Sequence, residues 1–181
     1  MSSLIINGDT SGSIVLAAPA VAGSNTLTLP TLTGTVLTNK TVGTVLQVVQ
    51  VTSTAQTTTT STNTWVTTGL AASITPSSST NKILALVTGN GYTSTTYVQI
   101  LTTLFRGGTN LSTYGLSQIY SSTGSCQAPL SLTYLDSPAT TSSTTYTVYF
   151  TLANAAGTAT WNSQNAWGQP TTSIQLLEIA A

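Results

Sequence analysis

The side chains capable of acid–base or nucleophilic chemistry are few and far apart in the sequence. The carboxylates are Asp9, Asp136 and Glu178, the single thiol is Cys126, and there is no histidine. A glycosidase needs two carboxyl groups about 5–10 Å apart, and a cysteine nucleophile needs a neighbouring base. The spacing predicts neither arrangement, although folding or assembly of several chains could bring carboxylates together. We therefore expect no enzymatic activity and no bound metal or cofactor.

Two glycine-containing segments, 88–92 (TGNGY) and 106–110 (RGGTN), have a composition that phosphate-binding loops share. A phosphate loop leads into a helix whose N-terminus holds the anion. No helical periodicity follows either segment, so both are predicted to be hairpin turns. Cys126, within 123–127 (TGSCQ), is predicted to be a small, half-buried residue in a loop or at a strand end.

Charge is almost absent from this chain. Only 3% of the residues are charged and the net charge is zero, whereas about 25% is typical of soluble domains. The three cations, Lys40, Lys82 and Arg106, are too scattered to neutralise phosphates, so no nucleic-acid binding is expected. The apolar stretch 16–23 is too short for a membrane span, and the N-terminus lacks the pattern of a signal peptide. A single cysteine is typical of folding in a reducing cytoplasm.

An uncharged surface rich in serine and threonine favours contact between identical copies, because no like charges need to lose their hydration. The composition therefore indicates a protein that works within an assembly. A neutral, secreted monomer is the alternative that composition leaves open.

Apolar and polar residues alternate with period two along most of the chain, and no segment keeps a helical period over three turns. Clusters of Gly, Asn, Ser, Thr and Pro separate the alternating segments. This pattern predicts an all-β, antiparallel β-sandwich or barrel. The low-complexity tract 52–64 is predicted to be a polar strand or wide hairpin loop in preference to a linker. The alternating segments are 45–51, 83–87, 97–105, 130–135, 146–152 and 174–179.

Several of these segments are apolar on both faces. In 97–106, Leu101 and Phe105 fall on one face while Ile100 and Leu104 fall on the other. A sandwich strand of a monomer normally has a polar outer face. The second apolar face is therefore expected to be covered, by another copy of the chain or by an overlying loop.

Residues 1–44 differ from residues 45–181 and are predicted to form a short, β-rich arm in front of the sandwich domain. The arm contains four apolar strandlets, which are too short to build a core of their own. In a trimer they would bury their apolar side chains at a shared axis; without a partner they would form an extended arm. The predicted trimer-interface and attachment residues are Ile14, Leu16, Leu27, Leu29, Val36 and Leu37.

The segment 7–30 (NGDTSGSIVLAAPAVAGSNTLTLP), followed by 33–37 (TGTVL), resembles a segment of fibre and capsid-decorating proteins of tailed phages, notably cyanophages and other marine phages. The ending 172–179 (TSIQLLEI) is similar to the last strand of the jelly-roll heads of such proteins. The resemblance covers about the first 40 and the last ten residues. It implies a jelly-roll-like homotrimer, made in the host bacterial cytoplasm and placed on the virion surface.

Within that resemblance, the short N-terminal segment favours a capsid decoration or cement protein, whose partner would be the major capsid protein. A fibre or tail neighbour is the alternative partner. The competing function is a fibre-tip adhesin that binds host-surface glycans by stacking and amide hydrogen bonds. Its predicted contacts are Trp161, Asn162, Trp167 and Gln169, unless the two tryptophans fill the end of the sandwich or the trimer axis, as Trp65 is expected to fill the core. Further candidates for a rim are Tyr92, Tyr97, Tyr114 and Tyr120.

Overall fold

The computed structural model describes residues 3–7, 10–11, 13–17, 42–153, 157–164 and 168–181, and these residues form strands and loops without a helix. Every pairing between strands is antiparallel. The fold class predicted from the period-two alternation, an all-β antiparallel sandwich, is therefore confirmed. No helix in the described part of the chain is long and apolar enough to cross a membrane.

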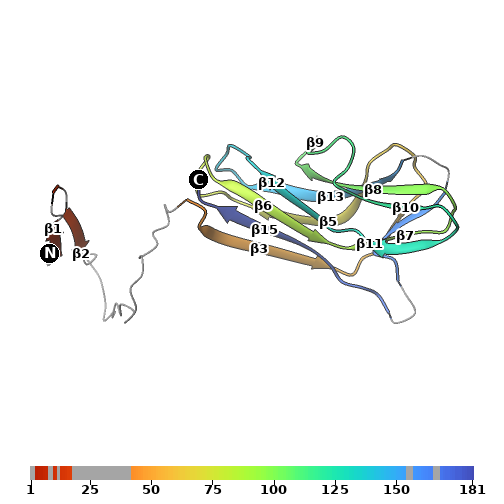
Figure 1. The fold of residues 1–181 in the computed structure, drawn as a ribbon, viewed down its shortest axis with the longest axis horizontal. Helices are drawn as coiled ribbons and strands as arrows, with labels where there is room; N and C mark the ends of the chain where they lie inside the picture. Colours follow the sequence, from red (N-terminus) through yellow and green to blue (C-terminus); the bar gives the residue numbers. More distant parts are fainter. Residues whose placement is uncertain (1–2, 8–9, 12, 18–41, 154–156, 165–167) are drawn as a thin grey trace. The chain divides into compact units, whose positions relative to one another are not determined.

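The chain divides into two compact units, Met1–Val36 and Leu37–Ala181. In the first unit, β1 (Ser3–Asn7) and β2 (Ser13–Ala17) form an antiparallel hairpin. Near the start of the described part of the second unit, the Gly43 N–H donates to the carbonyl of Ala180 at 2.8 Å, and the Ala180 N–H donates to the Thr44 carbonyl at 2.9 Å. The second unit is the sandwich (Figure 1).

One layer of the sandwich, which we call the β8 layer, has the strand order β10–β8–β13–β5, with the short β9 paired to the end of β8. Its strands are β5 (Val66–Ile74), β8 (Val98–Arg106), β9 (Thr109–Asn110), β10 (Ser117–Ser121) and β13 (Thr144–Leu152).

The other layer, which we call the β15 layer, consists of four chain segments that are each interrupted once. The interruptions divide it into two sheets with corresponding orders, β12–β6–β15–β3 and β11–β7–β14–β4. Its strands are β3 (Val45–Ser53), β4 (Thr57–Thr59), β6 (Lys82–Thr88), β7 (Asn90–Thr93), β11 (Cys126–Pro129), β12 (Leu132–Asp136), β14 (Ala159–Trp161) and β15 (Thr172–Ile179).

When each interrupted segment is counted as one strand and the short β9 is set aside, the described part of the sandwich has eight strands, four in each layer. In the β15 layer the first of these eight strands (β3) lies beside the last (β15), and in the β8 layer the second (β5) lies beside the seventh (β13). This order is that of a jelly roll with two Greek keys. The tract 52–64 contributes the end of β3, the edge strand β4 and the loop to β5, so it belongs to the sandwich.

The core lies between the layers and follows from the alternation. On β5, Leu70, Ala72 and Ile74 are buried, while Ala71 between them is half-buried and Ser73 is exposed. The same pattern on the facing strands completes one continuous apolar cluster. Its largest fully buried side chains are Trp161, Tyr146, Phe150, Leu70, Ile74, Ile83, Ile100, Leu104, Leu130, Leu152, Ile174 and Leu176.

The predicted hairpin turn at 88–92 is wrong. The chain runs on from β6 into β7 with one residue, Gly89, between them. A Cβ atom at Gly89 would clash with the six-membered ring of Trp161, lying 2.5 Å from Cζ2. Glycine is thus required here for close packing of a distant indole against the backbone, and not for reversing the chain.

We predict that Gly89→Ala lowers the free energy of unfolding by about 1–3 kcal/mol, because the added methyl group forces Trp161 out of its place. Thermal unfolding followed by circular dichroism measures the change. Gly108→Ala is the matched control, since a Cβ at Gly108 meets nothing within 4 Å. Equal melting temperatures for the two variants would contradict the packing role of Gly89.

Candidate functional site

A row of four apolar side chains crosses the outer face of the β15 layer. Leu135 on β12 pairs with Leu84 on β6, Leu84 pairs with Leu177 on β15, and Leu177 pairs with Val48 on β3. Because side chains at paired positions point to the same face of a sheet, these four side chains lie side by side. At the two ends of the row, Leu135 is 52% exposed and Val48 is 59% exposed.

Further apolar residues widen this row. Ile179 pairs with Val45 beside it, and Leu86 stands on its other flank, between Thr133 and Gln175. The next paired positions are Thr88, Ser173 and Thr52, which are polar and uncharged. We call the apolar part of this face the apolar band, which consists of Val45, Val48, Leu84, Leu86, Leu135, Leu177 and Ile179.

The outer face of the β8 layer also carries apolar side chains, but these are half-buried. Leu101 and Phe105 are half-buried on this face, while Ile100 and Leu104 are fully buried on the inner one, as the alternation predicted. The ring of Phe105 packs against Tyr149 of β13 with a centroid distance of 4.1 Å. Neighbouring side chains of the same layer therefore partly cover this face.

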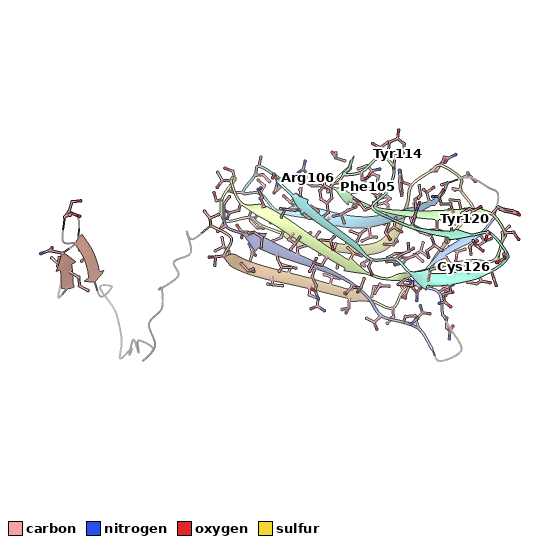
Figure 2. The ribbon with its side chains drawn as sticks, viewed as in Figure 1. Phe105, Arg106, Tyr114, Tyr120 and Cys126 are labelled. Carbon is pink, nitrogen blue, oxygen red and sulfur yellow. The ribbon has the colours of Figure 1, made fainter. Side chains whose placement is uncertain are left out.

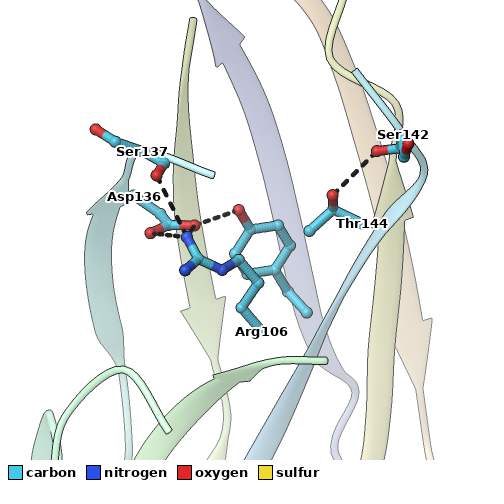
Figure 3. Close-up of polar contacts among 6 residues, drawn as sticks. Arg106, Asp136, Ser137, Ser142 and Thr144 are labelled. Carbon is cyan, nitrogen blue, oxygen red and sulfur yellow. Dashed lines mark hydrogen bonds and ion pairs between the residues drawn. The ribbon is translucent and has the colours of Figure 1, made fainter. Parts of the chain in front are cut away.

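The charged residues that the structure describes are mostly engaged inside the chain. Arg106 Nη1 donates to both carboxylate oxygens of Asp136 at 2.8 Å, and the Tyr146 hydroxyl donates to Oδ2 at 2.6 Å (Figure 3). Burial, together with the hydrogen bond to Asp136, raises the pKa of Tyr146 above its usual range. The cluster ties β8, β12 and β13 together, and its carboxylate is already bound by a guanidinium and a phenol.

Glu178 is fully buried and accepts four hydrogen bonds. The donors are Asn81 Nδ2, Gln47 Nε2 and the Ser77 N–H, each at 2.6 Å, and the Ser77 hydroxyl at 2.8 Å. Burial by itself raises the pKa of this carboxyl, but the hydrogen bonds outweigh it and lower the pKa to about 2. Glu178 therefore remains ionised and fixes the 75–81 turn to β15 and β3. Among the described residues no group of three or more metal-ligating side chains comes together.

Two of the four predicted glycan contacts, Trp161 and Asn162, lie in the interior of the sandwich. Trp161 is 1% exposed and Asn162 is fully buried, so neither side chain can contact a sugar, and Trp161 fills the sandwich next to Gly89. Asn162 Nδ2 donates to the Ala55 carbonyl at 3.2 Å, and Gln169 Nε2 donates to the Asn162 carbonyl. Trp167 lies outside the described residues. These amides thus form hydrogen bonds within the protein on either side of residues 165–167.

The predicted trimer-interface residues of the arm are not brought together by anything the structure describes. Ile14 and Leu16 lie on β2, where the backbone but not these side chains is described. On the same hairpin Ile5, Ile6 and Val15 are more than half exposed. The other four predicted residues lie outside the described residues, namely Leu27, Leu29, Val36 and Leu37.

The β8 layer carries a surface depression of about 640 Å³ that the sequence did not predict, and we call it the Trp65–Tyr114 depression. Trp65, expected in the core, is half-buried there, and Tyr114 is 87% exposed. Tyr97 and Tyr120, two other candidates for a rim, are more than half exposed but lie outside the lining. The lining residues are Asn63, Trp65, Gln99, Leu101, Thr113, Tyr114, Gln118, Thr151 and Ala153.

Comparison with known proteins adds little to this geometry. No protein-family model matches the sequence, and no curated protein matches it. Among solved structures, the chain is similar to a chain in the structure of infectious bursal disease virus, Gx strain, with 14% identity and a TM-score of 0.37. The match covers 99% of this chain and 47% of the viral chain, so this chain spans about half the length of its match. The assignment of a jelly roll therefore rests on the strand order.

We predict that Glu178 makes the stability of the sandwich sensitive to acid. Its folded pKa of about 2 is below the ordinary value of 4.5, so its contribution is complete above about pH 4.5 and is lost as the pH falls toward 2. Glu178→Gln should lower the free energy of unfolding by roughly 2–4 kcal/mol at pH 7. Urea unfolding at several pH values should show that this difference shrinks below pH 4.5. A difference that is the same at pH 3 and pH 7 would contradict the assignment.

Proposed function

We propose that this protein is a non-enzymatic virion structural protein, which associates as a homotrimer and decorates a bacteriophage capsid. The observation that carries the proposal is the apolar band. A sandwich strand that faces water normally carries polar side chains there, and a contiguous exposed apolar patch marks an interaction surface. The registered row Leu135–Leu84–Leu177–Val48 runs across all four strands of its sheet.

The energetic balance favours covering the band with further copies of the chain. Complete burial of an exposed Val or Leu side chain contributes roughly 1.5–3 kcal/mol, and association costs roughly 4–15 kcal/mol. One such side chain is too little. The three exposed side chains of the band, Val45, Val48 and Leu135, together with the remaining exposed area of its four half-buried ones, reach the lower end of this cost. Lys82, at the end of β6, is the one charged residue on the outer face of these strands, so few charges would be dehydrated.

The strand at the edge of this sheet also supports assembly. β3 is nine residues long, and its sequence VLQVVQVTS contains neither proline nor a charged residue. Monomeric proteins protect such edges with lysine, proline or bulges. Here a bulge lies at the Glu178/Ile179 end of the pairing with β15, and the rest of β3 is regular. A neighbouring chain could therefore pair with β3 as well as cover the band.

The capsid setting rests on the sequence resemblance to phage virion proteins, and a jelly roll is a frequent architecture of capsid and lectin domains. Because a fold alone does not define a function, the division into two compact units is the more specific support. The N-terminal hairpin exposes Ile5, Ile6 and Val15, which suits attachment to the major capsid protein by strand addition. The sandwich would then form the exterior of the particle.

We predict that Val48→Glu converts the trimer into single chains, because a carboxylate in the apolar band would lose its hydration at the contact. Multi-angle light scattering should give three times the chain mass for the unmodified protein and one chain mass for the variant. The matched control is Ser73→Glu, an exposed position on β5 in the opposite layer, which should remain trimeric. An unmodified protein of one chain mass would disprove self-association, and a trimeric Val48→Glu would exclude the band as its interface.

We also predict that deletion of residues 1–36 removes capsid attachment but preserves the sandwich, because the second unit contains its own core. Immunogold labelling of virions should place the full-length protein on the shell. Binding of full-length and truncated chains to stripped shells, measured by co-sedimentation, should then differ at least tenfold. Equal binding would show that the hairpin is not the anchor, and labelling confined to the tail would contradict the capsid location.

A further inference from the structure

We propose that the Trp65–Tyr114 depression is a binding site for a neutral glycan. It is open to solvent, and its volume of about 640 Å³ is within the range of roughly 300–1,000 Å³ typical of small-ligand sites. Tyr114 reaches the outer boundary of the sandwich on the side of β8 and β9 (Figure 2). None of the nine lining residues that the structure describes is charged.

The wall that carries Trp65 is held in place by backbone contacts to β13. The Asn63 N–H donates to the Leu152 carbonyl at 2.7 Å, and Thr62 forms an isolated bridge with the same residue. Asn63 adopts a left-handed conformation with φ of 56°, which asparagine tolerates better than most residues. The loop before β5 thus presents Trp65 from a fixed position.

The opposite wall, the turn that carries Tyr114, is fixed just as firmly. The Ser112 hydroxyl donates to the Gly115 carbonyl at 3.0 Å, and the Leu116 N–H donates to the Thr102 carbonyl of β8 at 2.7 Å. Gly115 has a φ of 84°, and a Cβ there would lie 3.3 Å from Leu101 Cβ. The turn is therefore pressed onto β8, and Tyr114 remains exposed although the backbone that carries it is anchored.

Between these walls lie Leu101, which is half-buried, and two amides. Gln99 Nε2 donates to Gln118 Oε1 across the β8–β10 pairing, which orients both side chains. The Thr113 side chain completes the polar part of the lining, whereas Thr151 is buried and its hydroxyl donates to the Leu152 carbonyl at 3.2 Å. Amides and hydroxyls both donate and accept hydrogen bonds, as do the hydroxyl groups of a sugar.

The combination of groups identifies the chemical class of the ligand. Tryptophan and tyrosine offer flat faces with a polar edge, on which the C–H faces of a pyranose ring can stack. The uncharged polar lining matches sugar hydroxyls, whereas a phosphate, sulfate or sialic acid would find no cation in it. Because both walls are already ordered, binding costs little conformational entropy.

The site is compatible with the proposed trimer but does not depend on it. The depression lies on the β8 layer, whereas the apolar band lies on the β15 layer. Copies that cover the band would leave the depression open to the surroundings of the particle. Failure of one proposal would therefore not entail failure of the other.

The test uses the full-length protein and an immobilised panel of neutral gluco-, galacto- and manno-oligosaccharides, with sialylated and sulfated forms alongside. At least one neutral oligosaccharide should bind, and titration calorimetry then gives its affinity. Tyr114→Ala and Trp65→Ala should each weaken this affinity at least tenfold. Tyr120→Ala changes a tyrosine of the same layer that is 53% exposed and lies outside the lining; it is the matched control and should change the affinity less than twofold.

Melting temperatures separate loss of the site from loss of the fold. Trp65 is half-buried, so its replacement can destabilise the sandwich, whereas Tyr114 is exposed and its replacement should leave the melting temperature unchanged. The proposal is overturned if no neutral oligosaccharide on the panel binds or if only acidic glycans bind. It is equally overturned if the folded Tyr114→Ala variant binds as tightly as the unmodified protein.

Discussion

Apolar packing between the two layers is the interaction on which the rest of the structure depends. The described part of the chain contains one ion pair, that of Arg106 and Asp136, and its cysteine is free. The jelly roll must therefore be held together by the packing of buried side chains of β5, β8 and β13 against those of β6 and β15. Even the buried carboxylate of Glu178 serves this packing, because its hydrogen bonds fix a turn and an edge strand to β15.

Much of this fold could be predicted from the sequence, because the period-two alternation is a local property. The strand at 146–152, for example, shows its buried face in its own residues. The role of Gly89 could not be predicted, since the reason for it is Trp161, which lies 72 positions further along the chain. The order of strands is likewise a tertiary property, and only the resemblance to phage proteins suggested a jelly roll.

The two candidate surfaces, the apolar band and the Trp65–Tyr114 depression, also differ in how far the sequence could predict them. An exposed apolar face could be predicted, because Ile83 and Val87 on one face of a strand and Leu84 and Leu86 on the other leave both faces apolar. The Trp65–Tyr114 depression was not foreseeable, because its lining comes from separate loops and strands that the topology brings together. The tryptophans show why: Trp161 belongs to the core and Trp65 to the surface, which no local pattern distinguishes.

The two proposals assign different purposes to the two faces of the sandwich. A shallow, uncharged site binds a single sugar chain weakly, because hydrogen bonds to sugar hydroxyls replace equally good ones to water. The proposed trimer would present three such sites together, and linked sites gain apparent affinity of about 10²–10⁴ without any new contact. Many such trimers on one particle would extend this gain further. Weak recognition by each chain would then suffice for firm attachment of the particle to a glycan-coated surface, and the nearly uncharged exterior would keep that attachment largely independent of salt.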